Sequence, residues 1–442
     1  MTDLKTDKSL YATTAHSKRR SAAEKRFHRL GLGAILIGLC MLGILMTTIV
    51  TKGSGAFQQS FATLDIDLLE AKLDKTGNRD PEDLKKVTTF GYAPLIKAAV
   101  EQVVETHRIE TGLKSKDMAA IISKSAAAQM RYRVLDDPSL IGTTAEFKFL
   151  TNSWIDGYLK GRVTRETIGN NKNVSAEQLD FVDRLVGLGI VEKSFNMQFI
   201  FGADASDQRP EDAGIGVAMV GSLAMMCVVL FLALPIGVAA SVYLQEFAPK
   251  NRLTDIIAVN ISNLAAVPSI VFGILGLAIF INTLHFPQSA PLVGGLVLTL
   301  MTLPTIIIST RAALEAVPPS IRSAALALGA SKMQTTFHHV LPLAAPGILT
   351  GTILGLAQAL GETAPLLLIG MIGYVATNMP ETVTQGLLSP NSAMPAQIYE
   401  WAKRADPAFY ERAWGGIIIL LIFLITMNII AVTLRRRFER RW

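Results

Sequence analysis

The feature that most constrains this sequence is a set of long apolar runs separated by polar and charged segments. A bilayer core of about 30 Å needs roughly 20 mostly apolar residues in a helix. Six runs meet this length, so we predict membrane-spanning helices over residues 30–50, 213–243, 256–281, 292–309, 347–372 and 413–434. The expected fold class is therefore an all-α membrane protein with six transmembrane helices, which excludes a soluble enzyme and a disordered chain. The two cysteines, Cys40 and Cys227, both lie in apolar runs and indicate neither a disulfide framework nor a metal site.

Lysine and arginine gather at the two ends of the chain. Residues 1–29 hold eight of them, and residues 435–442 hold five arginines. Short cytoplasmic segments of membrane proteins carry an excess of these residues, so we expect both ends to be cytoplasmic. This topology requires an even number of spans and an uncleaved first span.

One long polar segment, residues 53–212, follows the first span and is expected outside the membrane. It carries a net charge of −4, whereas the rest of the chain carries +10. The apolar period from Leu95 to Val104 and the capping-box pair Ser175 and Gln178 predict helices in it. It contains no catalytic motif, and we expect a mainly helical accessory or docking domain.

The most specific pattern lies in the predicted inside loop of residues 311–346. Two adjacent prolines followed by Ser320 as a cap predict the start of a small-residue helix, which we expect to end at Gly329. A second short helix is expected over residues 331–340 and to stop at Pro342. Two short helices of this kind form a compact projection that a groove on another protein can hold.

This loop resembles the cytoplasmic EAA loop of the permease subunits of binding-protein-dependent ABC importers. The family's pattern is Glu-Ala-Ala, three residues, Gly, nine residues and Ile-x-Leu-Pro. The matching positions here are Ala324, Ala325, Gly329, Leu341 and Pro342. Ser323 stands where the family has Glu, and His339 where it has Ile.

Three further segments narrow the resemblance to phosphate-importer permeases of the PstA type. They are Val-Tyr-Leu-Gln-Glu-Phe-Ala-Pro at 242–249, Val-Pro-Ser-Ile-Val-Phe-Gly at 267–273 and Gly-Glu-Thr-Ala-Pro-Leu-Leu at 361–367. The resemblance covers roughly residues 195–440. It implies a type I ABC importer permease fold, with a permease core over 213–434 and a periplasmic insertion over 53–212 in a multi-pass protein of the bacterial inner membrane.

The resemblance also implies partners. These are a second permease of the PstC type, an ATPase dimer of the PstB type and a periplasmic phosphate-binding protein of the PstS type, besides membrane lipid. No Gly-Lys dipeptide occurs in the sequence, so a phosphate-cradling GxxxxGK[ST] loop is missing from it. We expect this chain to bind no cofactor and no nucleic acid and to be a transport subunit rather than an enzyme, with ATP and magnesium on the ATPase subunits.

A carboxylate inside the fifth predicted span is the leading candidate for the translocation path. An ionised Glu362 in a span is unfavourable by several kcal/mol unless it is paired or faces water, so a functional role is the default interpretation. The path residues we predict are Glu362, Thr363, Gly361, Pro365, Gln358, Asn260 and Asn263. Relatives have Arg at the position of Gln358, so the departure implies that the cation beside Glu362 comes from the partner permease. We expect the adjacent His338 and His339 to be polar surface rather than metal ligands.

Two alternative functions stay open at this point. In the first alternative, the chain is a permease for another oxyanion, such as sulfate or molybdate, because permeases for these anions share the EAA-type loop. In the second, the chain is a membrane sensor of phosphate status with residues 53–212 as its detector. The sensor interpretation lacks an output module, because the predicted inside segments are short.

Overall fold

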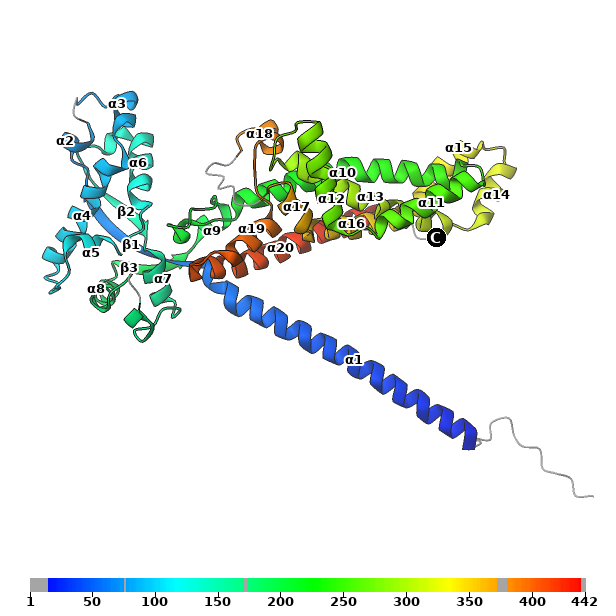
Figure 1. Ribbon diagram of the computed structural model, residues 1–442, viewed down its shortest axis with the longest axis horizontal. Coiled ribbons are helices and arrows are strands. Elements are labelled where there is room, and N and C mark those ends of the chain that lie inside the picture. Colours follow the sequence, from blue (N-terminus) through cyan, green and yellow to red (C-terminus); the bar gives the residue numbers. More distant parts are fainter. Residues whose placement is uncertain (1–14, 75–76, 171–172, 372–379, 439–442) are drawn as a thin grey trace, which may run out of the picture. The chain divides into compact units, whose positions relative to one another are not determined.

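The computed structural model describes residues 15–74, 77–170, 173–371 and 380–438 of the 442-residue chain. It divides into two compact units, residues 1–52 and 53–442. The first unit is one helix, α1 (Ala15–Gly53), which contains the predicted span 30–50 (Figure 1). Most of its apolar side chains are exposed, as in a helix whose partner is lipid.

Residues 53–212 of the second unit form a mixed α/β domain, which we call the insertion domain. Its helices are α2 (Glu70–Leu73), α3 (Pro81–Lys86), α4 (Thr89–Thr106), α5 (Ser115–Ala119), α6 (Ala126–Asp136), α7 (Ser153–Leu159), α8 (Ala176–Gly187) and α9 (Met197–Phe201). The predicted helix around Leu95 is α4, and Ser175 and Gln178 form the predicted capping box of α8.

The insertion domain also contains an antiparallel sheet that the sequence analysis missed. Its strands are β1 (Gln58–Asp67), β2 (Thr144–Leu150) and β3 (Val191–Phe195), in the order β2-β1-β3. In the register, Leu64 lies opposite Phe147, and Ala62 lies opposite both Phe149 and Val191. Helix α4 packs on β1 and closes the apolar core of the domain.

The remainder of the second unit is a helical core. Its long helices are α10 (Gly216–Val242), α13 (Pro291–Glu315), α16 (Leu341–Gly361) and α20 (Pro407–Phe438). Shorter helices are α11 (Arg252–Ala265), α12 (Ser269–Gly276), α14 (Pro319–Ala327), α15 (Lys332–Gln334), α17 (Ala364–Leu368), α18 (Val383–Leu388) and α19 (Met394–Lys403). Helix α13 packs along both α10 and α16.

The number of spans agrees with the prediction, whereas two of the six are bent or interrupted. Within the described residues, five helices are long and apolar enough to cross a membrane, and a sixth span results if α11 and α12 count as one bent pair. This pair bends by 98° at a break that contains Pro268, within the predicted span 256–281. The fifth predicted span is also interrupted, because α16 ends at Gly361 and α17 starts at Ala364. Its last predicted residue, Ile372, lies outside the described residues.

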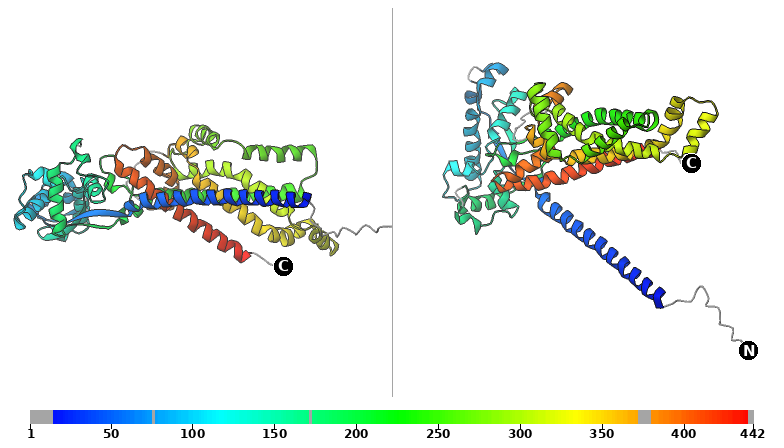
Figure 2. Two further views of the ribbon diagram at one scale, coloured as in Figure 1. Left: turned by 90° about the horizontal axis from the view of Figure 1, so that it is seen from below. Right: turned by 45° about the vertical axis from the view of Figure 1, so that its right-hand side comes forward.

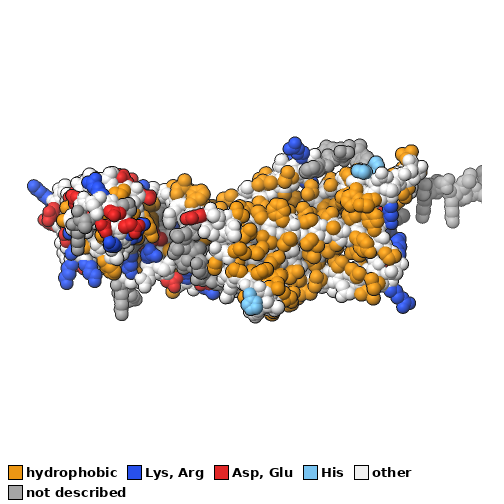
Figure 3. All heavy atoms as spheres, turned by 90° about the horizontal axis from the view of Figure 1, so that it is seen from above, with side chains coloured by type: hydrophobic (Ala, Val, Ile, Leu, Met, Phe, Trp, Pro, Cys, Tyr) orange, Lys and Arg blue, Asp and Glu red, His pale blue; other side chains and the backbone are white. Residues whose placement is uncertain are grey.

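The two ends of the second unit differ in character. The insertion domain lies at one end, and α14 and α15 lie at the other (Figures 1 and 2). Hydrophobic side chains cover the helical core between them, with Lys and Arg at the far end (Figure 3). This is the arrangement expected when an apolar band sits in lipid and basic loops lie on the cytoplasmic side.

A buried ionic network joins the insertion domain to α20. The Lys160 Nζ atom lies 2.6 Å from Asp156 Oδ2 and 2.9 Å from Glu411 Oε1, and Arg162 Nε lies 2.6 Å from Glu411 Oε2. The next residue, Arg412, is buried and donates hydrogen bonds to β1 and to the segment before α10. The insertion domain is therefore fixed to the core by charged side chains.

Candidate coupling loop and translocation path

The predicted inside loop folds into two short arms that project from the ends of α13 and α16 (Figure 2). The first arm is α14, and the second is α15, which continues as a π-helical turn, Thr335–Val340, directly into α16. Gly329 separates the arms with φ +88°, a backbone conformation that favours glycine, so the predicted helix end there is confirmed.

Two details of the predicted loop are wrong. The N-cap of α14 is Pro318 rather than Ser320, because the helix starts at Pro319 and its fixed φ suits a first turn. The second helix does not stop at Pro342. Pro342 is the second residue of α16 and lies within the helix that runs on from α15 through the π-helical turn Thr335–Val340, whose last residue already has a helical backbone conformation.

The five residues that carry the EAA-type match occupy three environments. Ala325 is buried, whereas Ala324 and Gly329 are exposed. Leu341 and Pro342 are half-buried at the start of α16. Below them, Val242, Leu314, Val317, Val340, Ala344 and Ile348 form an apolar cluster. The loop therefore rests on the ends of α10, α13 and α16 together.

Sequence reasoning missed one polar contact in this region. Arg322 of α14 forms an ion pair with Glu246, with Nη2 2.7 Å from Oε1. Glu246 belongs to the π-helical turn Tyr243–Phe247, which extends α10. Nothing local in the sequence connects Arg322, which lies in the predicted inside loop, to an acid 76 residues earlier.

Glu362 lies at the break between α16 and α17. It is the C-cap of α16, with an extended ψ of 128°, and is followed by Thr363, the N-cap of α17, and Pro365 in the first turn of α17. Its side chain is half-buried and has no hydrogen bond or ion pair with the described residues. An unpaired acid at an interrupted helix is the arrangement found where membrane helices open toward a cavity or a partner.

Of the other path candidates, Gln358 lies one helical turn before Glu362 on α16, whereas Asn260 and Asn263 lie on α11. Gln358 and Gly361 are exposed on α16, and Asn260 and Asn263 are exposed on α11. The Asn260 Nδ2 atom donates to the carbonyl oxygen of Ile256 within its own helix. No residue of α11 is buried, so the face that carries both asparagines is available to another molecule.

The described residues contain no group of three or more His, Cys, Asp or Glu side chains placed to hold a metal ion. His338 and His339, which tempt such an assignment, are both exposed.

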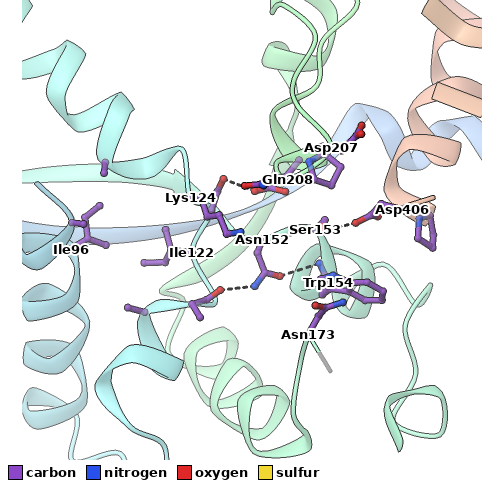
Figure 4. Close-up of a pocket in the computed structure, with 18 of the residues that line it drawn as sticks. Ile96, Ile122, Lys124, Asn152, Ser153, Trp154, Asn173, Asp207, Gln208 and Asp406 are labelled. Carbon is purple, nitrogen blue, oxygen red and sulfur yellow. Dashed lines mark hydrogen bonds between the residues drawn. The ribbon is translucent and has the colours of Figure 1, made fainter. Parts of the chain in front are cut away.

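A cavity lies against the insertion domain, away from the loop and from the predicted path residues (Figure 4). It has a volume of about 690 Å³, and Ile96, Asn152 and Trp154 form part of its wall. The cavity is also lined by three acids, Asp207, Glu211 and Asp406, and by one base, Lys124. None of the predicted path residues lines this cavity.

The spans, the two-armed loop and the interrupted fifth helix define a permease of a multi-pass membrane transport system. Residues 233–442 match the family model described as "Binding-protein-dependent transport system inner membrane component". Residues 14–168, which include α1 and much of the insertion domain, match a "Domain of unknown function".

Individual relatives give the narrower family. A phosphate transport system permease protein PstA 1 of Mycobacterium tuberculosis is 34% identical over 235 residues, covering 52% of this chain and 74% of the relative. The PstA protein of Haemophilus influenzae is 31% identical over 221 residues, covering 50% and 74%. This chain belongs to the PstA family of phosphate transport system permease proteins. Among solved structures, the MetNI methionine ABC transporter is 17% identical with a TM-score of 0.39, covering 50% of this chain and 94% of that chain.

Proposed function

We propose that this chain is the membrane-spanning permease subunit of an ATP-driven importer of inorganic phosphate. It forms half of a translocation path with a second permease of the PstC type. An ATPase dimer of the PstB type engages the loop of residues 311–346, and a PstS-type phosphate-binding protein delivers substrate from the periplasm. ATP and magnesium are bound by the ATPase subunits.

The observation that carries the proposal is the membership in the PstA family, taken with the placement of the matched loop. The loop lies at the end of the core opposite to the insertion domain. Because basic loops mark the cytoplasmic side, we assign both chain ends and the loop to the cytoplasm and the insertion domain to the periplasm. Closure of the ATPase dimer then moves the loop, and the spans switch between outward and inward access.

The test is ATP-dependent uptake of radiolabelled phosphate into proteoliposomes that contain this chain with the products of its genomic neighbours. Sulfate and molybdate serve as competitors. Uptake that neither competitor reduces supports phosphate as the substrate. Uptake abolished by sulfate or molybdate supports the other-oxyanion alternative, and no uptake by a demonstrably assembled complex counts against the proposal.

A further inference from the structure

Helix α14 of the loop buries few apolar side chains. Of its nine residues only Ala325 is buried, and Leu326 is half exposed. A helix of this length is unstable by itself in water, so its position depends on contacts with the rest of the fold. Besides the apolar contact of the half-buried Ile321 with the cluster around Val317 and Val340, α14 therefore depends on polar contacts.

Arg322 makes polar contacts of this kind with two other elements. Its Nε and Nη2 atoms donate to the Glu246 carboxylate, with distances to Oε1 of 3.2 and 2.7 Å. Its Nη1 atom donates to the carbonyl oxygen of Val317 at 2.7 Å, and Nη2 also donates to that of Leu314 at 2.8 Å. One guanidinium therefore connects α14 to the ends of both α10 and α13.

The geometry of this contact suits arginine and not lysine. The planar guanidinium presents donors in a fixed fork, which matches a carboxylate on one side and leaves further donors for the carbonyl groups. Leu314 lies in the last turn of α13, where carbonyl groups have no partner within the helix. The side chains are 23% exposed for Arg322 and 9% for Glu246, so water screens the pair only partly.

The second arm of the loop contacts the neighbouring residue on α10. The Lys332 Nζ atom lies 5.5 Å from the ring centroid of Phe247, within the range of a cation–π interaction. Glu246 and Phe247 both belong to the π-helical turn that extends α10. Turns of this kind are rare and occur often at functional sites. Both arms of the loop thus meet at one turn.

We infer that Arg322 and Glu246 are the positioning pair through which movement of the coupling loop reaches α10. The inference rests on the proposed function, because it assigns the loop to the ATPase. When a partner displaces α14, the ion pair moves the π-helical turn with it, and α10 carries the displacement along α13 into the core. Lys332 and Phe247 hold the second arm to the same turn.

The experiment compares Arg322→Glu, Glu246→Arg and the double swap that carries both changes. Lys250→Glu is the matched control, because Lys250 is an exposed basic residue at the same end of the core. Each complex is purified and reconstituted, and the phosphate taken up per ATP hydrolysed is measured together with co-purification of the ATPase. We expect each single variant to lower the uptake per ATP at least tenfold while the ATPase still co-purifies. We expect the double swap to recover only part of this loss, because it restores the ion pair, whereas the carboxylate of Arg322→Glu cannot donate to the carbonyl oxygens of Val317 and Leu314.

A single variant with the wild-type ratio, or a double swap as poor as the single variants, would overturn the inference. If the charge reversals are not produced as folded protein, Arg322→Lys takes their place, since it keeps the charge and loses the fork. A wild-type ratio in Arg322→Lys then overturns the inference, and a reduced ratio with the ATPase still bound supports it.

A second measurement needs no substrate. Cys227 on α10 is exposed and takes one spin label, and Ala324→Cys on α14 takes the other in a Cys40→Ser background. In the otherwise unchanged chain we expect one narrow distance that ATP does not alter, because the two helices move together. With Arg322→Glu the distribution should broaden. An ATP-dependent shift already present without that change overturns the inference. Absence of phosphate uptake by the wild-type complex would count against the proposed function and leave this distance result to decide the role of the pair.

Discussion

The Nζ atom of Lys160 lies 2.9 Å from Oε1 of Glu411 and joins the end of α7 to the beginning of α20 in a pair whose side chains are each 8% exposed. Asp156 and Arg162 add one further charge of each sign. Asp156, Lys160 and Glu411 are buried and Arg162 is 24% exposed, and buried charges of opposite sign satisfy one another where each alone would be unfavourable. The insertion domain and the last span are therefore expected to behave as one mechanical body.

Removing one charge from this network is expected to destabilise the protein strongly. Lys160→Met removes the cation that contacts both Asp156 and Glu411 and leaves them with Arg162 and the nearby Arg412, and loss of a partner in a buried pair costs about 3–5 kcal/mol. The apparent melting temperature of the detergent-purified chain, followed by tryptophan fluorescence, should fall. Arg165→Met is the control. Its pairs with Asp180 and Asp183 are about half exposed, so this variant should lower the melting temperature much less. Equal melting temperatures for the two variants would contradict the assignment.

Glu211, near the same junction, is expected to make stability depend on pH. Burial raises its pKa from 4.5 to about 7, and nearby Asp212 adds to the increase, while the hydrogen bond from Ser123 and the charge of Arg412 oppose it. Below pH 4.5 the folded and unfolded chains both hold the proton. Between pH 4.5 and 7 the unfolded chain releases it first, so the stability associated with the protonated acid is lost as pH rises through the folded pKa.

Glu211→Gln should remove this dependence. The variant is expected to melt close to wild type at pH 5 and above wild type at pH 8, since one pKa unit corresponds to about 1.4 kcal/mol. Melting curves between pH 5 and 8 test this, with the exposed Glu82→Gln as control. A constant difference between Glu211→Gln and wild type across that range would show that Glu211 does not titrate there.

The helical core was predictable because its signals are local. Apolar length alone located the spans, and φ > 0 at Gly329 agrees with the helix end predicted from its residue type. Two properties of the core were not predictable in the same way. Apolar length does not record direction, so the 98° bend near Pro268 was indistinguishable from a tolerated proline in a straight span. The apolar run that predicts the fourth span ends before Arg311, but helix α13 continues through this charged residue.

The insertion domain and the ionic contacts were less predictable because they depend on distant residues. Its strands are short, and β1 pairs with strands more than 75 residues further along the chain. Lys160 and Glu411 are 251 residues apart, and Arg322 and Glu246 are 76 apart. Charge type and position on the chain carry no information about such pairings. At Glu362, which the sequence analysis places inside the fifth predicted span, the structure has a helix break.

A charge introduced at Gly329 is expected to uncouple ATP hydrolysis from transport. A Cβ atom at this position meets nothing within 4 Å, so Gly329→Asp creates no clash. It does force a non-glycine residue into φ +88°, at a cost of about 1–2 kcal/mol, which should redirect the arm that follows. We expect normal membrane insertion, continued ATP hydrolysis and at least tenfold less phosphate uptake per ATP. Ser323→Asp places the same charge on exposed α14 without backbone strain, and identical uptake ratios in the two variants would refute a backbone role.

Neutralising Glu362 is expected to block transport without disturbing assembly. Glu362→Gln keeps the size of the side chain and removes its charge, and the described residues hold no ion pair or hydrogen bond that the change would break. Complex formation should therefore match wild type, while ATP-dependent phosphate uptake should fall to background if the charge shapes the path. Glu315→Gln, at the exposed end of α13, is the matched control and should transport normally. Uptake by Glu362→Gln at the wild-type rate would mean that the half-buried carboxylate at the break between α16 and α17 is a surface group and that the path runs elsewhere.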